Sequence, residues 1–122
     1  MSVSVPINIS ALPQRVNLNL YVGDDFFIEL VVTDDDGNPF DLTGYLADAQ
    51  VRLSATATDI QCTFDATIDQ NIVALHLARG EAANLPGKGV WDCQVDGERL
   101  LTLIAGDVTA AARVTRVTRG TP

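Results

Sequence analysis

Apolar and polar residues alternate along most of this chain with a period of two residues, which is typical of half-buried β-strands. In the segment 26–33, for example, Ile28, Leu30 and Val32 share one face and the intervening residues share the other. The pattern predicts strands at 16–21, 26–33, 46–53, 60–65, 72–77, 90–95 and 98–104, and an extended stretch over 108–118. A single helical turn is expected at 78–84. The chain is therefore predicted to be all-β.

Turn-forming residues separate the predicted strands at short intervals. Asp34–Pro39 holds a dense set of them, and Asp96-Gly97 is a strong signal for a two-residue hairpin. About seven short antiparallel strands spaced in this way predict an immunoglobulin-like β-sandwich, with a small closed barrel as the alternative. We expect an N-terminal arm at 1–14, one sandwich domain at 15–107 and an extended C-terminal arm at 108–122.

The net charge of the chain is unfavourable for two classes of binding partner. Its 122 residues include 16 acidic and 8 basic ones, for a net charge of −8, so nucleic acid and anionic membrane surfaces would repel it. Hydrophobic residues make up 47% of the chain, which is too many for a disordered protein. No apolar run approaches the roughly 20 residues needed to span a bilayer. We expect a globular domain with no nucleic-acid or membrane partner.

Residues that could support catalysis are scarce. His76 is the only histidine, and it lies in a predicted strand without a sequence neighbour suited to a nucleophilic site. Cys62 and Cys93 lack the spacing of a zinc site, and no glycine-rich phosphate loop is present. We expect no signal peptide, and therefore free cysteines. Trp91 alternates with polar neighbours, which favours a core position. The sequence predicts a non-enzymatic protein without a cofactor.

The acidic turn Asp34, Asp35 and Asp36 has two interpretations. Together with Asp24 and Asp25, one strand-length away, its oxygens could gather around Ca²⁺. Its order does not match the EF-hand spacing, and no glutamate follows at the far end. The favoured interpretation is a solvated connection whose aspartates promote the turn and keep the sheet edge from pairing.

Three segments in the first half of the chain resemble a module of tailed-phage virion proteins. They are YVGDDFF at 21–27, VVTDDDGNPFDLTGY at 31–45 and AQVR at 49–52. This order is similar to that of the N-terminal domain of the phage baseplate upper protein family and of related tail-fibre attachment domains. LPGKGVWDCQV at 85–95 is similar to the strand that precedes a hairpin in the same module. The resemblance spans most of residues 16–104.

The resemblance implies a small β-sandwich that builds a virion, with no catalytic residues to carry over. In that family the module heads a longer chain that ends in a receptor-binding part. The sequence ends at Pro122 without such a part, so we expect this chain to act as an adaptor in the tail, baseplate or fibre-attachment region of a virion assembled in the host cytoplasm. A capsid decoration protein is the second hypothesis. A ligand-binding immunoglobulin-like module of a bacterial surface protein is an alternative from another class.

The two arms are expected to carry contacts with other virion proteins and with copies of this chain in a homo-oligomer. The C-terminal arm places arginines among valines on an otherwise acidic body, which suits an acidic neighbour. The residues predicted to bind partners are Val5, Ile7 and Ile9 in the first arm, and Arg113, Val114, Arg116, Val117 and Arg119 in the second.

Overall fold

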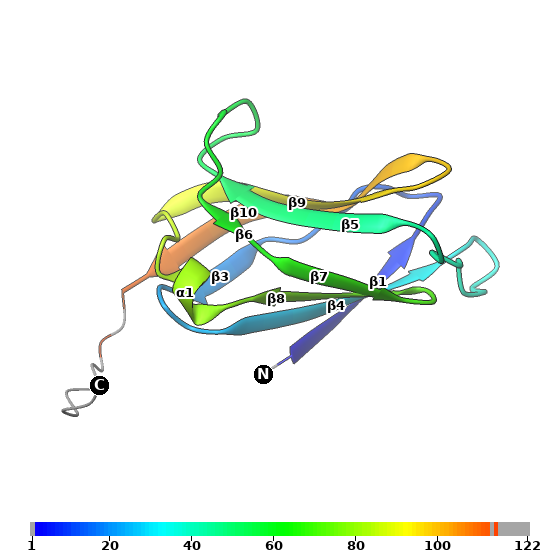
Figure 1. Ribbon diagram of the computed structural model, residues 1–122, viewed down its shortest axis with the longest axis horizontal. Helices are drawn as coiled ribbons and strands as arrows, with labels where there is room; N and C mark the ends of the chain where they lie inside the picture. Colours follow the sequence, from blue (N-terminus) through cyan, green and yellow to red (C-terminus); the bar gives the residue numbers. More distant parts are fainter. Residues whose placement is uncertain (1, 113, 115–122) are drawn as a thin grey trace.

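The computed structural model describes residues 2–112 and 114, which fold into two β-sheets packed face to face (Figure 1). The elements in this part of the chain are β1 (Ser2–Asn8), β2 (Gln14–Arg15), β3 (Leu18–Tyr21), β4 (Phe26–Thr33), β5 (Leu46–Arg52), β6 (Cys62–Thr63), β7 (Asp65–Asp69), β8 (Ile72–Leu77), α1 (Arg79–Ala82), β9 (Lys88–Asp96) and β10 (Leu100–Ala111). The first sheet has the order β1-β4-β8-β7. The second has the order β2-β10-β9-β5-β6, with β3 also paired to β10. The predicted all-β sandwich is confirmed, and the barrel alternative is wrong because the sheets are separate.

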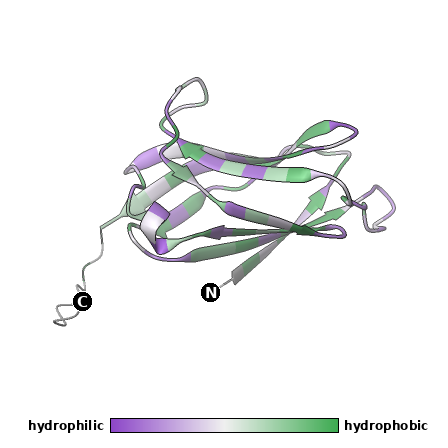
Figure 2. Ribbon diagram, in the orientation of Figure 1, coloured by the Kyte–Doolittle hydropathy of each residue, from purple (hydrophilic) through white to green (hydrophobic). Residues whose placement is uncertain are grey.

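The predicted alternation decides which side chains enter the core. Ile28, Leu30 and Val32 of β4 are all buried between the sheets, as their period of two requires. Trp91 of β9 is only 2% exposed, so its predicted core position is confirmed, and its ring lies 5.7 Å from that of Phe64. The strands accordingly alternate between hydrophobic and hydrophilic residues, whereas the turn after β4 is largely hydrophilic (Figure 2).

The N-terminal arm predicted at 1–14 is wrong for residues 2–8. These residues form β1, which pairs in parallel with β4 along its whole length. Ile7 is 0% exposed and belongs to the core between the sheets. Pro6 lacks an N–H group, which an edge strand such as β1 tolerates because its outer side has no neighbour to pair with.

The prediction of about seven strands, all antiparallel, is incomplete. Ten strands occur among the described residues, and three of their pairings are parallel, namely β1 with β4, β2 with β10 and β3 with β10. The N-terminal segment thus crosses from one sheet to the other and closes the same lateral side of both. β2 and β6 contain only two residues each. β6 lies within the strand predicted at 60–65, whereas β2 lies outside every predicted strand because two residues leave almost no alternation to detect.

The boundary predicted between a sandwich ending at residue 107 and an arm beginning at 108 is also wrong. β10 runs without interruption through this point to Ala111, and Val108 is fully buried. The register between β10 and β9 shifts between Thr102 and Ile104, which marks a β-bulge. The bulge lets Leu103 and Ile104, adjacent in sequence, both enter the core.

Two connections that shape the surface lie at the end of the sandwich opposite α1 (Figure 1). In the first, residues 34–45, Gly37 takes a φ of +82° that other residues rarely adopt, and Leu42 is 0% exposed beneath the turn. In the second, Asp96 pairs with Leu100, so the connection contains three residues rather than the predicted two. Its backbone is closed by a 3.1 Å bond from the Gly97 N–H to the Arg99 carbonyl.

Candidate interaction surfaces

The residues predicted to bind partners occupy different environments. Ile7 is a core residue, so its side chain is unavailable to a partner in this conformation. Val5 and Ile9 are half-buried and pack against the core. Val114 is 91% exposed. Arg113, Arg116, Val117 and Arg119 lie outside the described residues.

The acidic turn is organised by its own backbone. Asp34 Oδ1 accepts hydrogen bonds from the N–H groups of Asp36, at 2.9 Å, and Asn38, at 3.0 Å. The arrangement is an Asx-type turn, in agreement with the favoured interpretation that the aspartates promote the turn. Within the residues that the structure describes, no three His, Cys, Asp or Glu side chains are placed to hold a metal ion together. The Asp34, Asp35 and Asp36 set thus has no geometric support as a calcium site.

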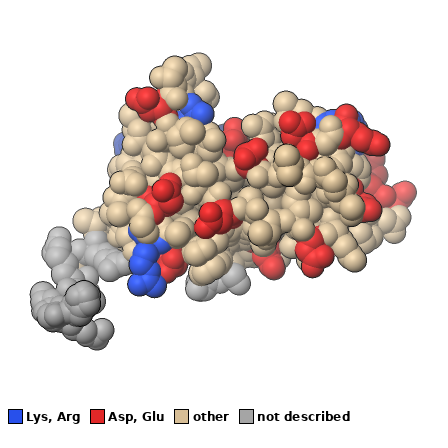
Figure 3. Space-filling view, viewed as in Figure 1, with Lys and Arg blue, Asp and Glu red and all other residues tan. Residues whose placement is uncertain are grey.

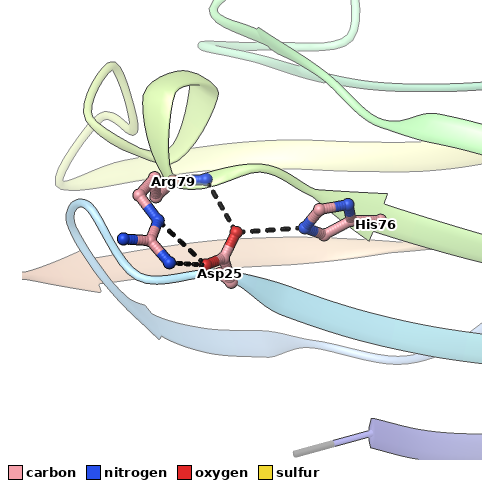
Figure 4. A network of polar contacts seen from close by, with 3 residues as sticks. All are labelled: Asp25, His76 and Arg79. Atoms are coloured by element: carbon pink, nitrogen blue, oxygen red, sulfur yellow. Dashed lines mark hydrogen bonds and ion pairs between the residues drawn. The ribbon is translucent and has the colours of Figure 1, made fainter.

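A polar cluster that the sequence analysis missed lies at the opposite end, where Asp25 meets His76 and Arg79 (Figure 4). Asp25 Oδ1 lies 3.0 Å from His76 Nε2 and accepts a 3.0 Å bond from the Arg79 backbone N–H. Its Oδ2 lies 3.1 Å from Arg79 Nε and 3.0 Å from Nη2. The partners are 51 and 54 residues away in sequence, so no local motif could have indicated the cluster.

The cluster ties α1 and β8 to the turn before β4. The bond with His76, followed by those with Arg79, lowers the pKa of Asp25, although partial burial opposes this effect. The His76 ring also stacks on Phe27, with the ring centres 4.2 Å apart and the planes 7° from parallel. Because both oxygens of Asp25 are bonded to β8 and α1, and the His76 ring also packs on Phe27 of β4, the arrangement is a structural clasp.

The cysteines are free and buried, as expected. Burial raises the pKa of the Cys62 thiol to about 11 and that of Cys93 to about 12. Cys62 Sγ donates a 3.1 Å bond to the Glu81 carbonyl, which attaches β6 to α1. Thiols in this state are poor nucleophiles because the reactive thiolate is scarce at neutral pH.

No helix in the described part of the chain combines the length and apolar character of a membrane span.

A hollow of about 440 Å³ lies on the outer face of the second sheet. Arg52 borders it and donates to the carbonyls of Ala57, at 2.8 Å, and Thr58, at 3.0 Å. On its other side, Arg15 Nη2 lies 3.2 Å from Asp107 Oδ2. Since these arginines are engaged with groups of the same chain, the hollow gives no strong indication of a charged ligand.

A second concavity, of about 510 Å³, lies where the two connections of the opposite end meet; we call it the end groove. The rings of Phe40 and Tyr45 line it together with the acidic residues Asp41 and Glu98. Gly97 lies so close to Tyr45 that a Cβ there would meet ring atoms at 2.7–2.9 Å. The Arg99 guanidinium lies 5.8 Å from the centre of the Phe40 ring, within cation–π range.

No model of a known protein family and no curated protein matches the chain. Among solved structures, the N-terminal domain of phage TP901-1 ORF48 is similar with a TM-score of 0.54 and 10% identity, over 90% of this chain and 98% of that one. An immunoglobulin structure, the titin M10–obscurin-like 1 complex, has a TM-score of 0.48 and 17% identity, over 85% and 94% of the two chains. The cysteine protease inhibitor EhICP2 from Entamoeba histolytica has a TM-score of 0.42 and 16% identity, over 90% and 97%.

At these identities the likeness concerns the fold. The chain is an all-β sandwich, as predicted, and a domain of a phage protein is among the structures that share its architecture. That domain corresponds to this chain over almost its full length, so the two are comparable as whole units.

Proposed function

We propose that this chain is a non-enzymatic structural protein of a tailed-phage particle, acting as an adaptor in the tail, baseplate or fibre-attachment region. The observation that carries the proposal is the likeness to a phage domain that extends over 98% of that domain. The sequence resemblance to phage baseplate and fibre-attachment modules supports it independently, because it rests on particular residues and not on overall shape.

The residues that carry the sequence resemblance have structural tasks in this chain. Asp34 closes the turn after β4, Leu42 fills the core beneath that turn, and Arg52 holds the loop after β5. A shared pattern of this kind specifies a sandwich with one particular end connection. It therefore supports a common building module without implying a common chemistry.

The available chemistry supports a non-enzymatic role. His76 is engaged with Asp25 and stacked on Phe27, and both thiols are buried with raised pKa values. The groups most often used as base and nucleophile are thus engaged in structure. We therefore propose that the chain acts through protein–protein contacts with other virion components and with further copies of itself.

The proposal is tested by counting this chain in purified particles of the phage or prophage that encodes it. Quantitative mass spectrometry against the major capsid protein gives the copy number. A few to a few tens of copies per particle is the expected result for a tail or baseplate component. Hundreds of copies would overturn the adaptor proposal in favour of a decoration protein. Absence from the particle would overturn both and favour the bacterial binding module.

A further inference from the structure

The end groove combines an aromatic lining with an acidic surround. Carboxylates dominate the two connections that form it and the end of β9: Asp34, Asp35, Asp36 and Asp41 lie in the first connection, Glu98 lies in the second and Asp96 ends β9, against a single basic residue, Arg99. Acidic side chains accordingly gather at this end of the molecule, on the right in Figure 3. The Arg99 guanidinium lies within cation–π range of the Phe40 ring, so an aromatic residue of the lining already faces a cation. The groove suits a segment that offers both cationic and apolar side chains.

The same chain contains a segment of that kind. Residues 108–122 include Arg113, Arg116 and Arg119, separated by valines and threonines, and no acidic residue. Valine suits the aromatic lining, and arginine suits the Asp41 and Glu98 carboxylates at the groove. The charge of the segment is therefore complementary to that of the end groove.

The direction of β10 prevents this segment from reaching the groove of its own molecule. β10 starts at the end groove and ends at Ala111 on the opposite side of the sandwich (Figure 1). Its 12 residues cover about 36 Å at the usual strand rise. Arg119 is seven residues beyond Ala112, a distance that spans at most about 25 Å when fully extended. A groove occupied by this segment must belong to another copy.

We infer that residues 113–119 of one copy bind in the end groove of the next, so that the chain assembles head to tail. Such a contact is heterologous: the donor surface and the acceptor surface are different parts of the molecule. Each copy therefore retains one free donor and one free acceptor until a ring closes or another virion protein occupies the last site. This inference rests on the proposed function and gives it a specific interface.

Sedimentation velocity of the full chain over a concentration series tests the inference with three variants. The groove variant carries Glu98→Lys in the lining and Asp96→Lys next to it in sequence, and the donor variant carries Arg113→Gln, Arg116→Gln and Arg119→Gln. A matched control carries Asp59→Lys and Asp65→Lys, which make the same charge change at exposed sites outside the groove. Circular dichroism and thermal unfolding verify that each variant is folded.

The wild-type chain and the control should form species larger than dimers as concentration rises. The groove and donor variants should each associate at least about tenfold more weakly, and higher salt should weaken the wild-type contact in the same direction. Mixing the two variants is the decisive step. The groove variant keeps an intact donor and the donor variant keeps an intact groove, so the mixture should give a one-to-one dimer that does not grow.

Three results would overturn the inference: a wild-type chain that stays monomeric, a control that loses association as the variants do, or variants that remain separate when mixed. These results leave the proposed function standing if the chain is present in virions. Conversely, a chain absent from virions can still show the one-to-one capture. The two failures are therefore distinguishable.

Discussion

The two ends of the sandwich use their carboxylates in different ways. At the α1 end, Asp25 binds His76 and Arg79, which lie more than 50 residues away in sequence. At the groove end, Asp34 and Asp41 accept bonds from N–H groups only two to four residues away. The first arrangement joins distant parts of the chain, whereas the second shapes a single connection.

This difference indicates where the molecule has surface charge available for partners. The Asp25 carboxylate has both oxygens engaged by distant groups. Asp41 concentrates its bonds on Oδ1, which accepts from both the N–H and the hydroxyl of Thr43. Those bonds lower the pKa of Asp41, so it stays ionised at the groove. One end therefore has its charge engaged in the fold, and the other presents charge on preformed turns.

The largest expected effect comes from removing the core residue beneath the acidic end. Leu42 is fully buried, so Leu42→Ala should lower the free energy of unfolding by about 2–5 kcal/mol, as cavity-forming changes of this kind do. Leu46 starts the next strand at the same end but is 73% exposed, and Leu46→Ala should change stability by less than about 0.5 kcal/mol. Urea unfolding of both variants measures the difference. Equal losses would show that the turn is not anchored in the core.

A smaller loss of folding stability is expected from Asp25→Asn at the α1 end. The pKa of Asp25 is lowered in the folded chain by its bonds with His76 and Arg79, so the ionised form stabilises the fold. This contribution is present above the ordinary pKa of 3.8 and is lost as the pH falls through the lowered folded value. Asp25→Asn should remove that part of the acid sensitivity and lower stability at neutral pH.

Urea midpoints of the wild type and Asp25→Asn, measured from neutral pH to below pH 3.8, test whether the ionised Asp25 carboxylate stabilises the fold. The two curves should converge as the pH falls, because protonation of Asp25 removes from the wild type the same stabilisation that the substitution has already removed. Asp35→Asn removes an exposed carboxylate from the groove end and is the matched control. Parallel curves for wild type and Asp25→Asn would contradict a stabilising role for the clasp.

The same contrast explains what could be predicted from the sequence. Alternation places Ile28, Leu30 and Val32 in the core because burial in a strand has a period of two, and the Asp34 turn is predictable because its bonds are local. The Asp25–His76 contact and the end groove depend on how the sheets bring distant segments together. Periodicity contains no information about such pairs.

The error at the N-terminus has a related cause. Val3, Val5 and Ile7 show the alternation of a strand, but residues 1–14, which end in Ala11-Leu12-Pro13-Gln14, are predicted to be an arm. The formation of β1 depends on pairing with β4 across 25 residues of sequence. The continuation of β10 past residue 107 was missed because its bulge shifts the alternation by one residue near Leu103. A register shift of this kind makes one strand look like two segments.

The smallest expected change in stability tests most directly whether an aspartate acts as an acceptor for nearby backbone N–H groups or as the ionic partner of distant residues. Asp34→Ala removes the acceptor for the Asp36 and Asn38 N–H groups and should lower stability by about 1 kcal/mol. Asp34→Asn keeps an oxygen at the same position and should recover most of the loss, because an Asx turn needs an acceptor rather than a charge. At Asp25 the Asn variant should not recover stability, since Arg79 requires a carboxylate. Urea unfolding of Asp34→Ala, Asp34→Asn, Asp25→Ala and Asp25→Asn measures this asymmetry; equal recovery by Asn at both positions would show that the two ends do not differ in the way their contacts indicate.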